Sequence, residues 1–74
     1  VLVNGSEAEI VDYKTDRGKT PADFLRAYAK QLLLYRAAVE KRLGVTVTKC
    51  TIYSFELSQE IDVPLALPQN AKKS

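Results

Sequence analysis

The spacing of apolar residues divides the chain into a hairpin, one long helix and two further strands. Residues 1–3 and 8–14 are apolar-rich runs on either side of Asn4-Gly5. This dipeptide favours a tight hairpin turn because both residues tolerate positive φ. The two runs are therefore predicted to pair antiparallel. Residues 16–19 are polar and follow the second run as a turn.

A helix is predicted from Pro21 to Leu43. Thr20 suits the N-cap, Pro21 suits the first helical position and Asp23 completes a capping-box pattern. Gly44 is typical of a helix end. Residues at helical spacing are predicted to form one apolar face: Phe24, Leu25, Tyr28, Leu32, Tyr35, Val39 and Leu43. Leu33 falls among the polar positions and is expected to be exposed.

The remaining chain predicts a long strand and a short one. Residues 45–55 are rich in Val, Thr, Ile and Tyr, which favour strands. Residues 60–63 suggest a short final strand, and residues 64–74 look irregular. The order strand, strand, helix, strand, strand predicts an α/β protein of the α+β type with a mixed sheet. We expect one partial domain over residues 1–63 and an irregular tail over 64–74.

Composition limits the chemistry that 74 residues can carry. Hydrophobic residues make up 46% and charged residues 27%, with a net charge of +2. One cysteine and no histidine exclude an internal disulfide and a zinc or iron–sulfur site built from this chain. Cys50 is expected to be a small buried hydrophobe. A single thiol fits a reducing compartment.

No segment approaches the roughly 18 apolar residues that span a bilayer, so no membrane partner is expected. No signal-peptide pattern is found either. The chain contains no methionine, and Val1 already lies in a predicted strand. We therefore interpret the chain as a piece of something longer.

Asp12 and Lys14 are the residues that most strongly suggest chemistry. Side chains alternate along a strand, so these two share one face with Ile10 while Val11 and Tyr13 point to the other. An acid and a lysine are thus held about 6–7 Å apart at their Cα atoms. An ordinary half-buried strand would carry an apolar residue at position 12.

This pair suits hydrolysis of a phosphodiester. Mg²⁺ is usually held by one or two carboxylates with phosphate and water, and a lysine can stabilise developing negative charge. Asp12 is predicted to bind the metal, with the Tyr13 carbonyl as a second contact, and Lys14 to be the catalytic cation. The simpler interpretation is a solvated surface pair.

Gln31 and Tyr35 lie four apart and are neighbours on the helix. A glutamine inside an apolar stripe is costly unless its amide is hydrogen-bonded. One interpretation is a satisfied core amide or a helix edge near solvent, and the other is contact with the strand end or with DNA. Arg17 and Lys19 follow the charged strand and are either phosphate-binding or simply solvated.

The run I-V-D-Y-K-T-D from Ile10 to Asp16, followed by Q-L-L-L-Y from Gln31 to Tyr35, resembles the RecB-like branch of the PD-(D/E)xK nuclease superfamily. The closest likeness is to the C-terminal nuclease domain of AddA-type helicase–nuclease subunits. The downstream runs K-C-T-I-Y-S-F and E-I-D-V are also similar, so the resemblance covers about residues 1–63.

The resemblance implies a restriction-endonuclease-like mixed sheet flanked by helices and a DNA exonuclease dependent on Mg²⁺ or Mn²⁺. It makes Asp12 a metal ligand, Lys14 catalytic, and Gln31 and Tyr35 substrate contacts. The larger protein would unwind and resect double-strand breaks in the bacterial cytoplasm with a second, AddB-type subunit. ATP would bind only its motor domains, because no G-x-x-x-x-G-K-[ST] occurs here.

Two features of the family are missing from these residues: an acidic residue on a preceding strand and an upstream histidine. Glu9 points to the wrong face, and Asp16 lies about 13 Å along an extended strand from Asp12. We therefore expect an incomplete metal site and a chain that is inactive alone. The alternatives are a non-catalytic DNA-binding or protein-docking module, or an unrelated α+β protein with a chance D-x-K, whose Asp12 and Lys14 would lie far from the helix pair.

Overall fold

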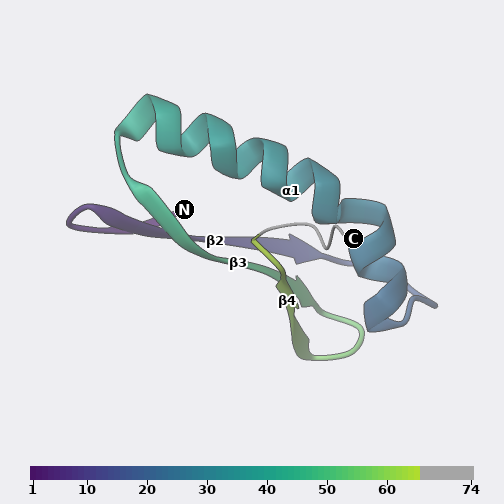
Figure 1. The fold of residues 1–74 in the computed structure, drawn as a ribbon. Coiled ribbons are helices and arrows are strands. Elements are labelled where there is room, and N and C mark those ends of the chain that lie inside the picture. Colours follow the sequence, from purple (N-terminus) through teal and green to yellow (C-terminus); the bar gives the residue numbers. More distant parts are fainter. Residues whose placement is uncertain (66–74) are drawn as a thin grey trace.

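The computed structural model describes residues 1–65, which form four strands and one helix (Figure 1). In chain order the elements are β1 (Leu2–Asn4), β2 (Glu7–Lys14), α1 (Pro21–Leu43), β3 (Thr46–Ser54) and β4 (Gln59–Val63). The predicted order of elements is confirmed, and the helix has its predicted bounds. Most of the predicted irregular tail, from residue 66 onward, lies outside the described residues.

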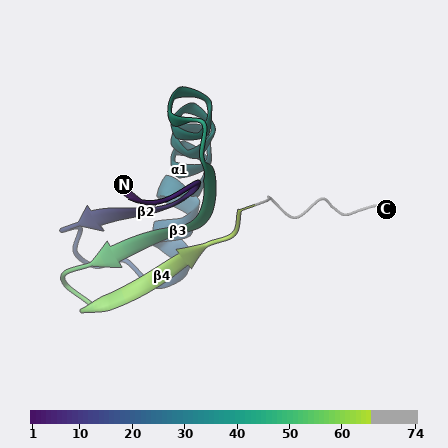
Figure 2. The ribbon, with the colours of Figure 1, turned by 90° about the vertical axis from the view of Figure 1, so that its left-hand side faces the viewer.

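The four strands form one mixed sheet in the order β1-β2-β3-β4. The β2–β3 pair is parallel, whereas β1–β2 and β3–β4 are antiparallel (Figure 2). In the parallel register Asp12 is opposite Ile52 and Lys14 is opposite Ser54. The carboxyl ends of two neighbouring strands therefore meet at one edge. The α+β class with a mixed sheet is confirmed, and the restriction-endonuclease-like form of it remains a prediction.

The first hairpin turns one residue later than predicted. Asn4 pairs with Glu7, so the turn residues are Gly5 and Ser6, with Gly5 at a φ of 64°. Positive φ is easy for glycine, and this fixes where the chain reverses. The register of β2 with β3 shifts between Ala8 and Glu9.

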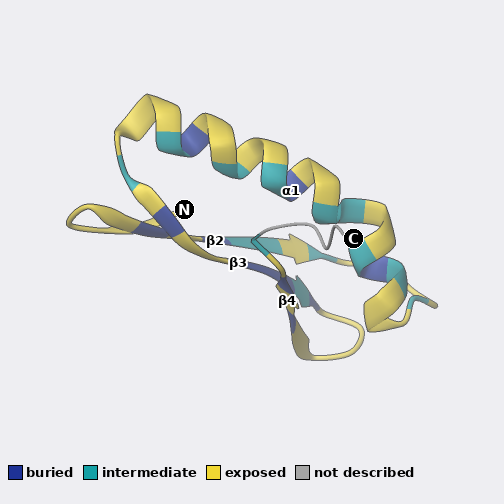
Figure 3. Cartoon of the chain, viewed as in Figure 1, coloured by how far each residue is buried: buried dark blue, intermediate teal, exposed yellow. Residues whose placement is uncertain are grey.

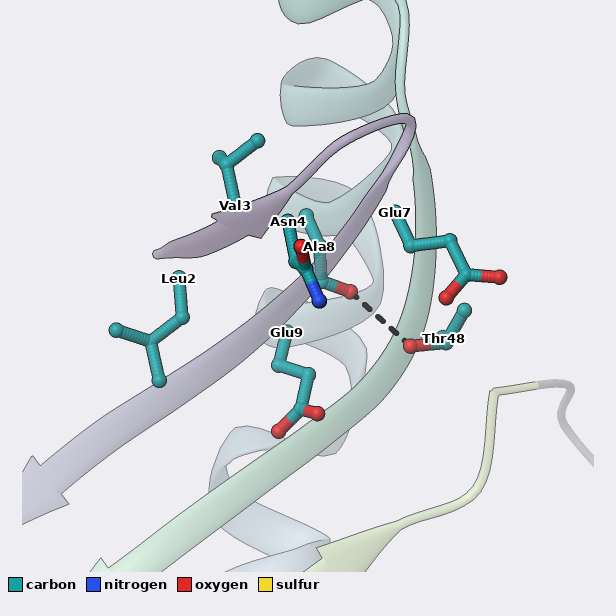
Figure 4. A pocket seen from close by; sticks show the side chains of 7 residues that line it. All are labelled: Leu2, Val3, Asn4, Glu7, Ala8, Glu9 and Thr48. Carbon is teal, nitrogen blue, oxygen red and sulfur yellow. Dashed lines mark hydrogen bonds between the residues drawn. The ribbon is translucent and has the colours of Figure 1, made fainter.

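At that shift Thr48 Oγ1 donates to the Ala8 carbonyl at 3.3 Å. Beside this contact lies a shallow pocket of about 140 Å³ (Figure 4). Its walls come from the hairpin and the start of β3, and none of the predicted site residues lines it.

Both ends of α1 are capped as the sequence predicts. The Asp23 N–H donates to Thr20 Oγ1 at 3.2 Å, and the Thr20 N–H donates to Asp23 Oδ2 at 3.0 Å. At the other end Gly44, at a φ of 64°, donates its N–H to the Glu40 carbonyl. The Glu40 carboxylate also accepts the Val47 N–H at 2.8 Å, which ties the end of the helix to the start of β3.

The core lies between α1 and one face of the sheet (Figure 3). Its buried members come from the helix and from β2, β3 and β4: Ala8, Ile10, Phe24, Leu32, Val39, Val47, Cys50, Ile52, Ile61 and Val63. Cys50 is 1% exposed, as predicted, and burial raises the pKa of its thiol.

The predicted apolar face of the helix was wrong at three positions. Tyr35 and Leu43 are 50% and 55% exposed, whereas Leu33 is partly buried against the core. The reason is that α1 packs mainly on β3 and β4. The buried stripe is therefore turned toward that side of the helix, and Tyr35 is left beside the less covered strand β2.

The other face of the sheet carries an aromatic cluster of Tyr13, Tyr53 and Phe55. Ring centroids are 5.7 Å apart for Tyr13–Phe55 and 5.2 Å apart for Tyr53–Phe55. Tyr13 and Phe55 are exposed, while Tyr53 is partly buried. The expectation that Tyr53 and Phe55 take part in sheet packing fits these contacts. Among the described residues, no helix is long and apolar enough to cross a membrane.

We expect Thr20→Ala to lower the free energy of unfolding by about 1 kcal/mol, because the substitution removes the side-chain cap of α1. Urea denaturation followed by circular dichroism measures this change. Thr15→Ala, in the exposed turn before the cap, is the matched control and should alter stability by less than roughly 0.5 kcal/mol. Equal stability of the Thr20→Ala variant and the unsubstituted chain would contradict the role of the cap.

Candidate functional site

Asp12 and Lys14 lie side by side at the carboxyl end of β2. Lys14 Nζ is 3.2 Å from Asp12 Oδ2, and the side chains of Lys14 and Asp12 are 25% and 33% exposed. The strand alternation therefore holds them together, as predicted. A partly exposed ion pair of this kind contributes at most about 1 kcal/mol. Its main effect is to orient the two groups.

The helix pair lies against the same place. An open pocket of about 400 Å³ is lined by the ion pair together with residues of the strand, the helix and the N-terminus: Val1, Ile10, Val11, Asp12, Lys14, Gln31, Leu32 and Tyr35. Gln31 and Tyr35 are both exposed. The interpretation of Gln31 as a core amide is therefore wrong, and so is the arrangement in which the two pairs lie far apart.

The other predicted site residues lie elsewhere. The Tyr13 side chain is on the opposite face of the sheet with Phe55, so only its carbonyl remains a candidate contact. Neither Arg17 nor Lys19 lines the pocket. Arg17 is exposed, and Lys19 Nζ binds Asp16 Oδ2 at 2.7 Å. Their role with phosphates stays a prediction.

A polar network beside the pocket was not predicted. Asp16 Oδ2 accepts hydrogen bonds from the Tyr28 hydroxyl at 2.6 Å and from Lys19 Nζ at 2.7 Å. The Tyr28 ring lies under the Lys14 ammonium, with Nζ 4.3 Å from its centroid. Lys14 is thus held between a carboxylate and an aromatic face.

These contacts shift three pKa values. The hydrogen bonds from Lys19 and then Tyr28 lower the pKa of Asp16. The bond to Asp16 raises the pKa of Lys19 and also raises the pKa of the Tyr28 hydroxyl. The network is therefore fully charged on Asp16 and Lys19, and neutral on Tyr28, across the neutral pH range.

The sequence carried a weak signal for this network. Tyr28 was predicted only as an apolar position, although its hydroxyl needs a partner when the ring is half-buried. Asp16 was assigned to a turn, and helical or strand spacing does not relate it to Tyr28. The loop after β2 brings them together, helped by a hydrogen bond from the Gly18 N–H to Glu56 at 2.8 Å.

The residues present supply part of a metal site. Asp12 is the one carboxylate among those that line the pocket. Within residues 1–65, no group of three or more His, Cys, Asp or Glu side chains is placed to hold a metal ion. Mg²⁺ is commonly held by one or two carboxylates with phosphate and water. The described residues therefore do not by themselves make a complete site.

Fold and pocket together define a class: an α+β domain with a charged pocket at the carboxyl ends of parallel strands, where open α/β sheets commonly bind ligands. The resemblance to AddA-type proteins is confirmed by comparison with curated proteins. The chain is 44% identical over 55 residues to the larger chain named as the A component of the ATP-dependent helicase/nuclease of Clostridium botulinum. It is 36% identical over 72 residues to the protein of the same name in Desulfitobacterium hafniense.

These matches cover most of this chain and little of its relatives. The first spans 74% of the chain and 4% of the Clostridium botulinum protein, and the second spans 92% of the chain and 5% of the Desulfitobacterium hafniense protein. The chain is thus homologous to a short segment of a helicase/nuclease protein. No protein-family model matches it, and no solved structure matches it significantly.

We expect one tyrosine of this chain to ionise with a pKa above the ordinary value of 10.0, because the Tyr28 hydroxyl donates to Asp16. A raised pKa means that the folded state favours neutral Tyr28. Its stabilising effect is therefore present below pH 10.0 and is lost as the pH rises through the folded-state pKa. An ultraviolet absorbance titration measures the ionisation.

Two variants assign this titration step. Tyr28→Phe should remove it, and Asp16→Asn should move it down toward the ordinary value. A titration curve left unchanged by Asp16→Asn would show that the hydrogen bond does not set the Tyr28 pKa.

Proposed function

We propose that this chain is part of the nuclease domain of an ATP-dependent helicase/nuclease and that its pocket holds a DNA phosphodiester for hydrolysis. One observation carries the proposal: the Asp12–Lys14 pair and the helix residues Gln31 and Tyr35 line one pocket. The name of the relatives, helicase/nuclease, supports the same interpretation.

The residues of the pocket suit a phosphate. Lys14 supplies a point charge that attracts a phosphoryl oxygen and stabilises the charge that develops during hydrolysis. The Gln31 amide and the Tyr35 hydroxyl are neutral donors of the kind that contact the DNA backbone without reading its sequence. The apolar floor, Ile10 and Leu32, limits water around these groups.

Asp12 would supply one carboxylate to a Mg²⁺ or Mn²⁺ ion, which polarises phosphoryl oxygens and activates water when it is bound. The Tyr13 carbonyl is a further candidate contact. The remaining protein ligands would come from outside residues 1–65. Asp12 also orients Lys14, since the charged atoms of the two are 3.2 Å apart.

The wider role is proposed from the relatives alone. The whole protein would be an ATP-dependent enzyme of DNA repair and recombination that unwinds and resects broken duplex ends in the bacterial cytoplasm. It would work with an AddB-type subunit. Residues 1–63 would form part of its exonuclease domain, and ATP would act in its motor domains.

A second candidate is a non-catalytic DNA-binding or protein-docking module of the same fold. The observation that favours it is the single carboxylate lining the pocket. A pocket that binds phosphate through Lys14, Gln31 and Tyr35 without completing a metal site would contact DNA but not cleave it.

The test that separates the two is a chimera. The matched segment of the Clostridium botulinum protein is replaced by this sequence, and cleavage and unwinding of linear duplex DNA are assayed with ATP and Mg²⁺. We expect Lys14→Ala and Asp12→Ala each to reduce cleavage at least about 100-fold, typical of losing an electrostatic stabiliser. Unwinding should continue, because no ATP-binding motif lies in this segment.

Lys30→Ala is the matched control, because Lys30 is an exposed helix residue outside the pocket. The Lys30→Ala chimera should cleave at the unsubstituted rate. Equal cleavage by the Lys14→Ala chimera would reject a catalytic role for the pocket. A cleavage-deficient unsubstituted chimera that still binds DNA would favour the binding module.

We also expect the 74-residue chain to bind Mg²⁺ weakly, with no site tighter than about 1 mM, because one pocket carboxylate leaves most ligands to water. Isothermal titration calorimetry measures the affinity, and Asp12→Asn is the comparison. A tight single site that disappears in the Asp12→Asn variant would mean that the residues present already complete the metal centre.

A further inference from the structure

Lys14 has a side chain that does not orient itself. A lysine carries its charge on a flexible four-carbon stem with a substantial rotamer entropy. A cation that must meet a phosphoryl oxygen in one place therefore needs contacts that select one rotamer. The Asp12 carboxylate provides one such contact from the same strand, at 3.2 Å.

The second contact comes from the helix. Lys14 Nζ is 4.3 Å from the centroid of the Tyr28 ring, well within the range of a cation–π interaction. The ring is itself held in place. Its hydroxyl donates to Asp16 Oδ2 at 2.6 Å, and the ring packs on Phe24, with centroids 6.3 Å apart. Phe24 is fully buried, so this side of the ring rests on the core.

Asp16 is anchored as well. Lys19 Nζ binds the same carboxylate oxygen at 2.7 Å. One carboxylate thus links the loop after β2 to the second turn of α1. A chain of contacts runs from Lys19 through Asp16 and Tyr28 to Lys14, which lines the pocket.

We propose that Tyr28 is a positioning residue that holds the Lys14 ammonium at the pocket, with Asp16 fixing the orientation of the Tyr28 ring. This inference rests on the proposed function for its catalytic consequence, but the positioning itself is a property of this chain. Tyr28 does not line the pocket, so it acts through Lys14 and not on the substrate.

The positioning has a spectroscopic signature. Protons above an aromatic ring are shielded, so the ε-methylene of Lys14 should resonate upfield of its position in an unstructured peptide. Proton–carbon NMR of the 74-residue chain, with Lys14 assigned by Lys14→Arg, measures this shift. Tyr28→Leu should abolish the shift, whereas Tyr28→Phe should retain most of it because the ring remains.

Asp16→Asn should give an intermediate shift, since the ring then loses its charged anchor. Tyr53→Leu, in the aromatic cluster on the other face of the sheet, is the matched control and should leave the Lys14 shift unchanged. A purely structural role for Tyr28 predicts loss of stability without a specific change at Lys14. An ordinary Lys14 shift in the unsubstituted chain would overturn the proposal even if the Tyr28→Leu variant failed to fold.

The catalytic consequence is tested in the same chimera. Tyr28→Leu should lower the cleavage rate about two- to fivefold, the size expected from a partly exposed cation–π contact, and Tyr28→Phe should recover most of it. Full cleavage by Tyr28→Leu, beside loss of cleavage by Lys14→Ala, would overturn this inference and leave the proposed function standing. Full cleavage by Lys14→Ala would overturn the proposed function, while the NMR shift would still decide the positioning.

Discussion

The structure depends on the burial of one stripe of α1 against β3 and β4. Phe24, Leu32 and Val39 are the buried residues of the helix, and they meet the buried face of the central strand β3. Burial of large apolar side chains contributes about 1.5–3 kcal/mol each, far more than any surface ion pair here. This packing decides which face of the sheet is covered and where the helix lies over β2.

The pocket is a consequence of that packing. Because the helix sits mainly over β3 and β4, the carboxyl end of β2 is only partly covered. Asp12 and Lys14 occupy the covered face of β2, on which Ala8 and Ile10 are buried further along the strand. The strand thus changes from core to site within one run of alternating residues, and α1 contributes Gln31 and Tyr35 at the margin of its contact.

The same geometry separates two kinds of polar contact. Glu40, Val47 and Gly44 close the far end of the helix and serve only the fold. Asp16, Tyr28 and Lys19 lie at the near end, next to the pocket, and connect a loop, the helix and Lys14. Single carboxylates join separate elements at each end, which fixes the position of α1 along the sheet.

Much of this could be predicted from the residues alone. The caps Thr20 and Gly44 determined the helix bounds because they act through local hydrogen bonds and backbone conformation. Strand alternation determined that Asp12 and Lys14 share a face, since that geometry is local too.

The tertiary structure alone decided how far around the helix the buried stripe lies, and hence that Tyr35 is exposed and Leu33 partly buried. It also decided that Asp16 meets Tyr28. Both depend on the paths of segments far apart in sequence, and periodicity within one element does not encode them.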